Sequence, residues 1–273
     1  MDWWLKALVT AGTVAVVMGV ARHAGQRFAG LVAALLTVSA PTLVWLMQEH
    51  GLAFAVNAAI GSVSACAMLA AFALVYALVS RRGGVVAALL AGLLGAAALA
   101  MPALLTSDSL ASATLLALAA CTVTMAAMPG LRAGAIRGRS TGVQAACTAL
   151  AAGGVSVLVV TMSPVLGTFA TGLLSSLPTV SGAVAVIEHA AGGYRAVEQF
   201  LRGFVAGLFG KIVFFAAFVL LAQPLGAGWS LALASVAACV ATALLARTLH
   251  LASACHGSRR LAGEAAAVPA GQT

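Results

Sequence analysis

The chain has 273 residues, of which 63% are hydrophobic and only 7% charged, and its mean hydropathy is +1.10. This composition excludes an ordinary soluble domain, and apolar runs of about 20 residues, long enough to cross a bilayer, recur along most of the sequence. The net charge of +8 does not indicate nucleic-acid binding, because the positive charges fall in short segments between apolar runs. The sequence therefore predicts an all-α polytopic transmembrane helical bundle.

Nine transmembrane spans are predicted in chain order, separated by short polar or glycine-containing breaks. They cover residues 3–20, 29–47, 54–79, 84–104, 109–128, 142–162, 169–187, 199–222 and 228–248. The first run lacks a charged segment ahead of it and a cleavage site, so we interpret it as a retained span. The tail 251–273 is rich in Ala and Gly and is expected to be disordered.

Positive charge is distributed unevenly over this topology. All arginines fall on one side, and the other side receives only Lys6. Because cytoplasmic loops carry the excess of Lys and Arg, we expect the N-terminus outside, in the periplasm, and the C-terminus in the cytoplasm. Trp3, Trp4, Trp45 and Trp229 all fall at the outer interface, where tryptophans are enriched.

A stretch near Gly30 recurs near Gly172. The alignment that places Gly30 on Gly172, here called the repeat register, pairs further identical residues without a gap: Gly25 with Gly167, Thr37-Val38-Ser39 with Thr179-Val180-Ser181, Gly51 with Gly193, Gly61 with Gly203, and Phe72 with Phe214. We interpret this pattern as a diverged internal duplication. Five predicted spans separate equivalent points of the copies, and an odd number turns the second copy over in the membrane. Inverted repeats of this kind are typical of secondary transporters.

This interpretation divides the chain into four parts. They are a first four-span repeat (1–104), a linking span with a basic cytoplasmic loop (105–141), a second, inverted four-span repeat (142–250) and the tail (251–273). Transporters built in this way bind their substrates near the membrane midplane, where the repeats meet.

Hydroxyl groups and prolines of the duplicated stretch fall close to the predicted midplane. Each proline removes a backbone donor and frees carbonyl groups, so two broken or kinked helices with nearby hydroxyls form a candidate substrate site. The alternative is that the small residues only permit tight helix packing and the prolines only bend the helices. The predicted substrate-binding residues are Thr37, Ser39, Pro41, Pro178, Thr179, Ser181, Gly207 and Lys211.

Lys211 is the most informative single residue, because it lies near the middle of the span 199–222. A charge at this depth is costly and usually marks a pathway or a paired site. The sequence places no carboxylate at the same depth, so its partner could be backbone carbonyls, a water-filled cavity or an anionic solute. Gly207, one turn earlier, leaves space on the same face. The alternatives are a packed lysine that only stabilises the bundle and an ammonium that replaces a coupling cation.

Charged residues cluster at two predicted mouths of the bundle. The candidate gating residues are Glu188, Arg195, Glu198 and Arg202 at the inner mouth, and Glu49 and His50 at the outer mouth. Glu198 and Arg202 have the i, i+4 spacing of a helical ion pair, and a solvated interfacial pair is the alternative to a gate. No metal-ligand set, paired carboxylates, nucleophile motif or phosphate loop is present, so we expect no cofactor, no metal site and no enzymatic activity.

Short motifs in both copies resemble a known family. The segments are Phe28-Ala29-Gly30-Leu31 with Thr37-Val38-Ser39, and Thr171-Gly172-Leu173 with Leu177-Pro178-Thr179. They are similar to the second span of the small four-span GlpM-like proteins of the bacterial inner membrane, although the first copy has Leu36 where the second has Pro178. The resemblance implies a doubled, inverted relative in that membrane and a link to envelope polysaccharide production. It supplies no catalytic or binding residues.

Two hypotheses follow from these observations. The first is a secondary transporter or permease for a small solute. Anions are one class of solute that Lys211 would bind. The second is a non-transporting membrane subunit that scaffolds or assists an envelope polysaccharide or lipid biosynthesis assembly through lipid-facing glycine ridges at Gly61 and Gly203. The expected partners are membrane lipids and a small solute, and both a homodimer and a membrane partner subunit are compatible with the sequence.

Overall fold

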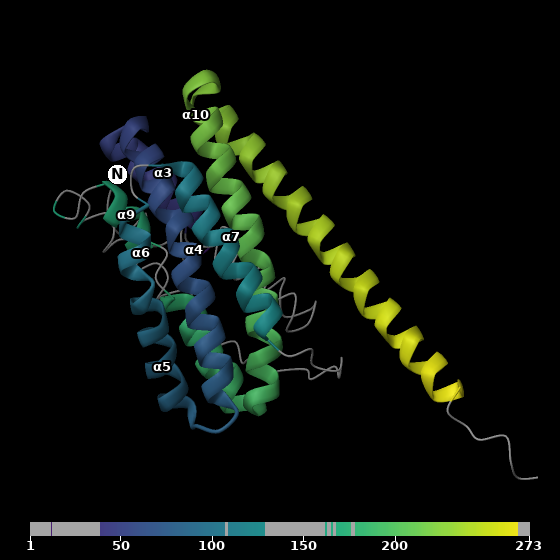
Figure 1. Cartoon of the computed structure of the whole chain (residues 1–273). Helices are drawn as coiled ribbons and strands as arrows, with labels where there is room; N and C mark the ends of the chain where they lie inside the picture. Colours follow the sequence, from purple (N-terminus) through teal and green to yellow (C-terminus); the bar gives the residue numbers. More distant parts are fainter. Residues whose placement is uncertain are drawn as a thin grey trace, which may run out of the picture.

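The structure, a computed structural model, describes residues 39–106, 109–128, 168–175 and 178–266, together with positions 12, 162 and 165. Within these residues it contains α-helices and no strands (Figure 1). The helices are α3 (Ser39–His50), α4 (Leu52–Ser80), α5 (Val85–Ala98), α6 (Ala100–Leu104), α7 (Leu110–Ala127), α9 (Thr168–Ser175) and α10 (Thr179–Ala266). The predicted all-α class is therefore confirmed for the described part of the chain.

Helix α10 is bent at two glycines rather than continuous. Gly193 and Gly226 have positive φ angles of 70° and 73°, and Pro224 lies beside the second bend. The bends divide α10 into helical segments 179–192, 194–225 and 227–266, and both fall in breaks that the sequence predicts. The second bend forms the tip of a hairpin at the top of Figure 1.

Four stretches of the described residues are long and apolar enough to cross a membrane. They are Leu52–Ser80, Val85–Leu104, Leu110–Ala127 and the bent stretch Ser181–Leu245. Helix α4 alone, at 29 residues, is about 43 Å long, which exceeds the roughly 30 Å of a hydrocarbon core. The structure is thus compatible with a polytopic membrane protein. The predicted spans 3–20 and 142–162 lie largely outside the described residues, so the number nine stays a prediction.

Helix α4 is the central element of the described fold. It packs against α3, α5, α6, α7, α9 and α10, and its residues from 58 to 73 are buried except Ile60 and Ala71. A helix can be enclosed on all sides in this way because about half of its residues, and ten of the sixteen from 58 to 73, are Ala, Ser or Gly, which allow neighbouring backbones to come close.

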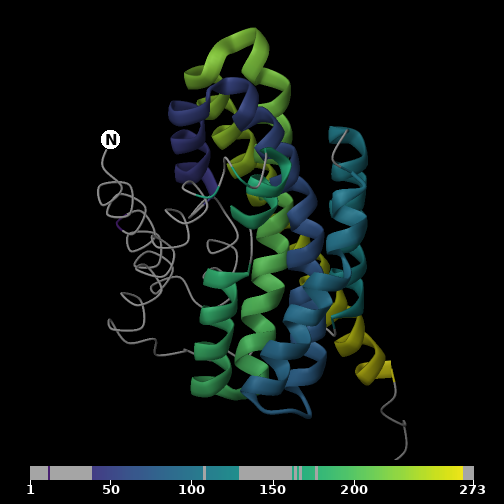
Figure 2. The ribbon, with the colours of Figure 1, turned by 90° about the vertical axis from the view of Figure 1, so that its left-hand side faces the viewer.

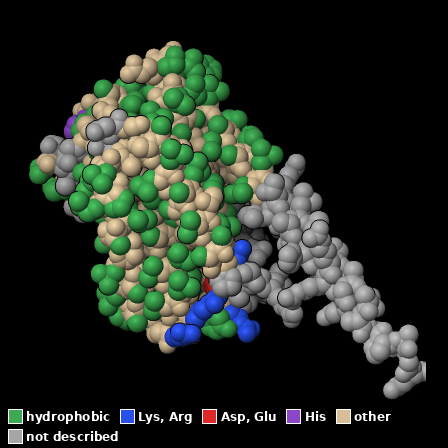
Figure 3. Space-filling model, viewed as in Figure 1, with side chains coloured by type: hydrophobic (Ala, Val, Ile, Leu, Met, Phe, Trp, Pro, Cys, Tyr) green, Lys and Arg blue, Asp and Glu red, His purple; other side chains and the backbone are tan. Residues whose placement is uncertain are grey.

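The surrounding helices turn small residues inward and large apolar residues outward. Helix α5 buries Ala88, Gly92 and Ala96, which are four residues apart. Helix α7 buries Ala113, Ala117 and Cys121 at the same spacing. The exposed side chains of α5 and α7 include Leu90, Leu94, Leu115 and Val123. In Figure 3 most of the described surface is apolar or uncharged, as expected for a surface that faces lipid, and the blue arginine side chains gather at the lower end.

The closest helix contact joins α4 to α9. A methyl group placed on Gly61 of α4 would overlap the carbonyl oxygen of Phe169, and one placed on Gly172 of α9 would overlap the backbone of Ala58. The hydroxyl of Ser62 donates to the carbonyl oxygen of Gly172 at 3.1 Å. The glycines therefore serve packing within the chain. The lipid-facing ridge expected at Gly61 is wrong, because α9 covers this position.

Helix breaks and buried positions recur in the repeat register. Gly51, which separates α3 from α4, has φ 86° and ψ 173°, and its counterpart Gly193 has φ 70° and ψ −170°. This region of backbone space is accessible almost only to glycine. The buried positions Ala88, Gly92 and Ala96 of α5 correspond in the same register to three buried positions of α10, which are Ser230, Ala234 and Ala238.

The last segment of α10 extends further than the sequence predicts. We expected the final span to end near residue 248 and a disordered tail to occupy 251–273. The structure instead continues the helix to Ala266. This stretch contains five Ala and two Leu, the residues with the highest helix propensities, and the disorder of the tail stays a prediction.

We expect Gly172→Ala to separate α4 from α9. The added methyl group would overlap the backbone of Ala58, which cannot yield as a flexible side chain would, and overpacking of this kind costs about 1–3 kcal/mol. The measurement is the melting temperature of the detergent-purified protein. Gly84→Ala is the matched control, because Gly84 has an ordinary φ of −72° and open space around it. Equal melting temperatures for the two variants would contradict the proposed contact.

Candidate functional site

The structure describes the predicted substrate-binding residues to different degrees. Thr37 lies outside the described residues, and Ser39, Pro41 and Thr179 are described only by their helical backbone. Pro178 and Ser181 are buried near the start of α10. Gly207 and Lys211 are buried in the segment 194–225.

The two prolines of the predicted site have different surroundings. The predicted span 169–187 is interrupted at Pro178, since α9 ends at Ser175 and α10 begins at Thr179. The carbonyl oxygen of Pro178 accepts a hydrogen bond from the backbone N–H of Gly182 at 2.8 Å, so the proline begins a helix instead of kinking one. Pro41 is the third residue of α3 as the structure describes it, and the turn before it, where a proline kink would lie, is outside the described residues, so the kink there stays a prediction.

The segments 179–192 and 194–225 lie side by side, joined at Gly193 (Figure 2). Counting from Gly193 at 1.5 Å per residue, Pro178 is about 22 Å and Lys211 about 27 Å from the bend. The fold therefore brings the start of α10 and Lys211 to comparable depths, even though they lie far apart in the sequence.

Lys211 is only 4% exposed. Its Nζ lies 5.9 Å from the ring centroid of Phe215, one turn further along the helix, within the range of a cation–π interaction. The electrostatic surroundings of Lys211 include the buried thiol of Cys66 of α4, so the two side chains lie near each other. Lys211 of α10 thus lies buried inside the bundle.

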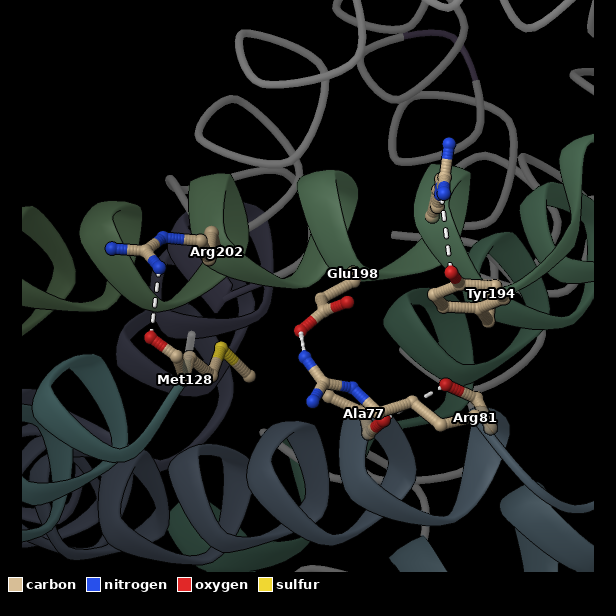
Figure 4. A network of polar contacts seen from close by, with 8 residues as sticks. Ala77, Arg81, Met128, Tyr194, Glu198 and Arg202 are labelled. Atoms are coloured by element: carbon tan, nitrogen blue, oxygen red, sulfur yellow. Dashed lines mark hydrogen bonds and ion pairs between the residues drawn. The ribbon is translucent and has the colours of Figure 1, made fainter. Parts of the chain in front are cut away.

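A polar network ties α10 to its neighbours at the arginine end of the bundle (Figure 4). Glu198 is fully buried and forms an ion pair with Arg81 at the end of α4. Its Oε1 accepts the hydrogen bond from Arg81, whereas its Oε2 has no hydrogen-bond partner among the residues that the structure describes. The guanidinium-bearing side chain of Arg81 is 35% exposed, so the pair lies at the boundary between protein and surroundings.

This arrangement corrects the local pair that the sequence predicts between Glu198 and Arg202. The carboxylate is buried rather than solvated, and its partner comes from α4. Arg202 instead donates from Nη1 to the carbonyl oxygen of Met128, at the end of α7, over 2.8 Å. The i, i+4 rule describes isolated helices, and here tertiary packing directs the two side chains to different neighbours.

The other candidate gating residues lie around this network or at the opposite end. His189 Nδ1 is 3.4 Å from the hydroxyl oxygen of Tyr76 of α4, and Glu188 is buried. Arg195 is exposed, and its Nε donates to the hydroxyl of the neighbouring Tyr194 at 3.1 Å. At the far end of α3, Glu49 is exposed and His50 packs on Phe54 with ring centroids 4.6 Å apart.

Sequence reasoning missed Arg81 as a site residue, because it was interpreted only as a topological charge. The signal that would have revealed it is the duplication itself. If the two copies are inverted, α4 and segment 194–225 run antiparallel, so the end of one meets the beginning of the other. Arg81 directly follows α4, and Glu198 lies in the first turns of its counterpart.

No group of three or more His, Cys, Asp or Glu side chains that could hold a metal ion occurs within the described ranges. We compared the chain with models of protein families, with curated proteins and with solved structures, and none of the three comparisons finds a match. The chemistry of the site therefore has to be argued from its own residues: a buried ammonium inside the bundle and a buried ion pair at one end.

We expect Arg81→Met to lower the stability of the protein by about 1–3 kcal/mol, because it leaves the buried carboxylate of Glu198 without its counterion. The double variant Arg81→Met with Glu198→Met removes both charges and should recover most of this loss. Unfolding in detergent, followed by circular dichroism, measures both effects. A double variant that is as unstable as the sum of the two single variants would mean that the ion pair contributes no coupling.

Proposed function

We propose that the chain is an integral membrane secondary transporter or permease for a small solute. In this proposal the two copies form inverted halves of four spans each, within a nine-span protein, and they rock about a midplane site that includes Lys211. The observation that carries the proposal is the antiparallel pairing of α4 with segment 194–225. Arg81 at the end of α4 pairs with Glu198 at the start of that segment, and the buried Cys66 and Lys211 lie near the middle of the two helices.

The recurrence of helix boundaries supports the inverted halves. Gly51 and Gly193 interrupt the two copies at equivalent positions with the same glycine-specific backbone. The repeat register carries α4, residues 52–80, onto residues 194–222 of the segment with which it pairs. Two equivalent helices that pack antiparallel at their middles are what a pseudo-two-fold axis in the membrane plane would produce.

Lys211 supports a solute-binding role within this architecture. A buried ammonium in a membrane helix is costly, and such residues usually serve a pathway or a paired site. The equivalent position in the first copy is Leu69, which is also buried, so packing at this place does not require a charge. An anionic solute, for example a carboxylate or phosphate compound, would have the charge complementary to Lys211.

The alternative, a membrane subunit that scaffolds envelope biosynthesis, rests on the resemblance to GlpM-like proteins. In that hypothesis the docking faces are lipid-facing ridges of glycines. In the structure, however, Gly61 packs against α9 and Gly203 is buried. The structure therefore favours the transporter over this form of scaffold. The arginine distribution and the resemblance support a bacterial inner membrane with the arginine end in the cytoplasm. Lipids surround the bundle, and a homodimer or a partner subunit remains compatible with it.

The proposal predicts that Lys211→Leu folds but loses both solute binding and transport. Detergent-purified protein is screened by thermal stability against metabolite anions, sugars and amino acids, and any stabilising compound is then tested for uptake into proteoliposomes. A ligand present at 100 times its Kd raises the unfolding free energy by about 2.7 kcal/mol. We expect this shift for the wild type and not for Lys211→Leu.

Leu69→Met is the matched control, because it alters the equivalent buried position of the first copy without changing charge, and it should keep the ligand response. A compound that stabilises Lys211→Leu as strongly as the wild type would place the binding site elsewhere. Uptake that survives in Lys211→Leu, or the lack of any stabilising and transported compound across the panel, would contradict the proposal.

A further inference from the structure

Arg81 and Glu198 differ in how readily each side chain can reach water if their ion pair opens. Arg81 follows the last turn of α4 and has a side chain that is 35% exposed, so it can rotate toward water. Glu198 is fully buried within α10, and its Oε2 faces no hydrogen-bond donor among the described residues. If the pair opens, Arg81 regains solvent, whereas Glu198 is left as a buried charge.

We propose that Glu198 is a proton-binding site, and that its protonation releases Arg81 and opens the arginine end of the bundle. The carboxylate accepts one proton on an oxygen and becomes a neutral carboxylic acid. Arg81 keeps its own proton and charge and turns to water. Protonation thus removes the buried charge that otherwise holds the two helices together, which makes opening favourable without any other chemical step.

The geometry fits a proton better than a metal ion. A proton needs a single carboxylate oxygen, and Oε2 lacks a partner among the described residues. A metal cation needs several ligands, and no suitable group of side chains exists in the described residues. The guanidinium of Arg81 would also repel a second cation at the same carboxylate.

Other ionisable groups near this end are possible sources of a pH response. Helix α4 and the two residues after it contribute Tyr76, Arg81 and Arg82, whereas α5 and α7, which pack against α4, contain no ionisable side chain other than the buried thiol of Cys121. Helix α10 itself contributes Glu188, His189, Tyr194, Arg195 and Arg202. His189, beside Tyr76, is the group that an experiment has to separate from Glu198.

This inference deepens the proposed function, because a protonated carboxylate that opens one mouth would couple solute movement to a proton gradient. The opening itself does not require that the protein transport anything. It can therefore be measured without a known solute, and in a variant whose solute site has been removed.

The test measures access to position 77, which lies one turn before Arg81 on α4 and is buried. Ala77→Cys is introduced into the full chain, and the variant protein is reconstituted in vesicles. It is then labelled with a membrane-impermeant maleimide that is supplied on both sides of the membrane. The parent protein with its five native cysteines supplies the background. Labelling rates are corrected for the pH dependence of the maleimide with an exposed model thiol, from roughly pH 5 to roughly pH 8.

We expect labelling of position 77 to be about tenfold or more faster at the acidic end, as an opened minor state becomes populated. Glu198→Gln mimics the protonated carboxyl and should label rapidly at every pH. His189→Gln and Glu188→Gln should keep the wild-type pH response. Lys211→Leu should also keep it, so a loss of transport in that variant is separated from a loss of proton-dependent opening.

Several results would overturn the inference. They are a wild-type labelling rate that does not change with pH, a Glu198→Gln variant that keeps the wild-type response, and a His189→Gln variant that loses it. A rate that follows sodium concentration instead of pH would assign the site to a metal cation. If Glu198→Gln does not fold, the wild-type response and its persistence in His189→Gln and Glu188→Gln decide the question.

Discussion

The small side chains of α4 are the constraint on which the described fold depends. In a bilayer the hydrophobic effect does not draw helices together, since lipid tails are as apolar as leucine, so association relies on close van der Waals contact. Gly61 allows α9 to approach until backbone meets backbone, and the Ala and Ser positions around it do the same for α5, α7 and α10. The contacts of this one helix thereby determine where the other described helices lie.

Close packing also determines where polar groups can be placed. Hydroxyls inside the bundle bond to backbone carbonyls across helix contacts, as Thr124 of α7 does with Ala70 of α4 at 3.3 Å. Full charges occupy other places: Lys211 is buried on α10, and the Arg81–Glu198 pair joins the end of α4 to α10. Among the described residues, the buried charged side chains are Glu188, Glu198 and Lys211, all on α10, and this contrast with the uncharged packing contacts marks a candidate site.

Hydropathy was sufficient to locate the spans around α4, α5 and α7, and glycine-containing breaks indicated the bends of α10, because both signals are local. The partner of Glu198 was not predictable in this way. Arg202 has the i, i+4 spacing of a helical ion pair with Glu198. Because α4 approaches antiparallel and Glu198 is buried, the carboxylate pairs with Arg81 instead, and Arg202 bonds to Met128. Pro178 was recognised as a helix break but not as a helix start, since that distinction depends on where the carbonyl bonds.

The hydroxyl of Ser62 has a consequence for the synthesis of the protein. It donates to Ala58 of its own helix at 3.1 Å as well as to Gly172, which is 110 residues further along the chain. At roughly 5–20 residues per second, about 5–20 s pass between the synthesis of these two partners. During that interval α4 lies in the membrane without α9, and its hydroxyl is already hydrogen-bonded locally. The hydroxyl of Ser62 is therefore hydrogen-bonded before Gly172 is available, and it does not have to bind water or another helix in the meantime.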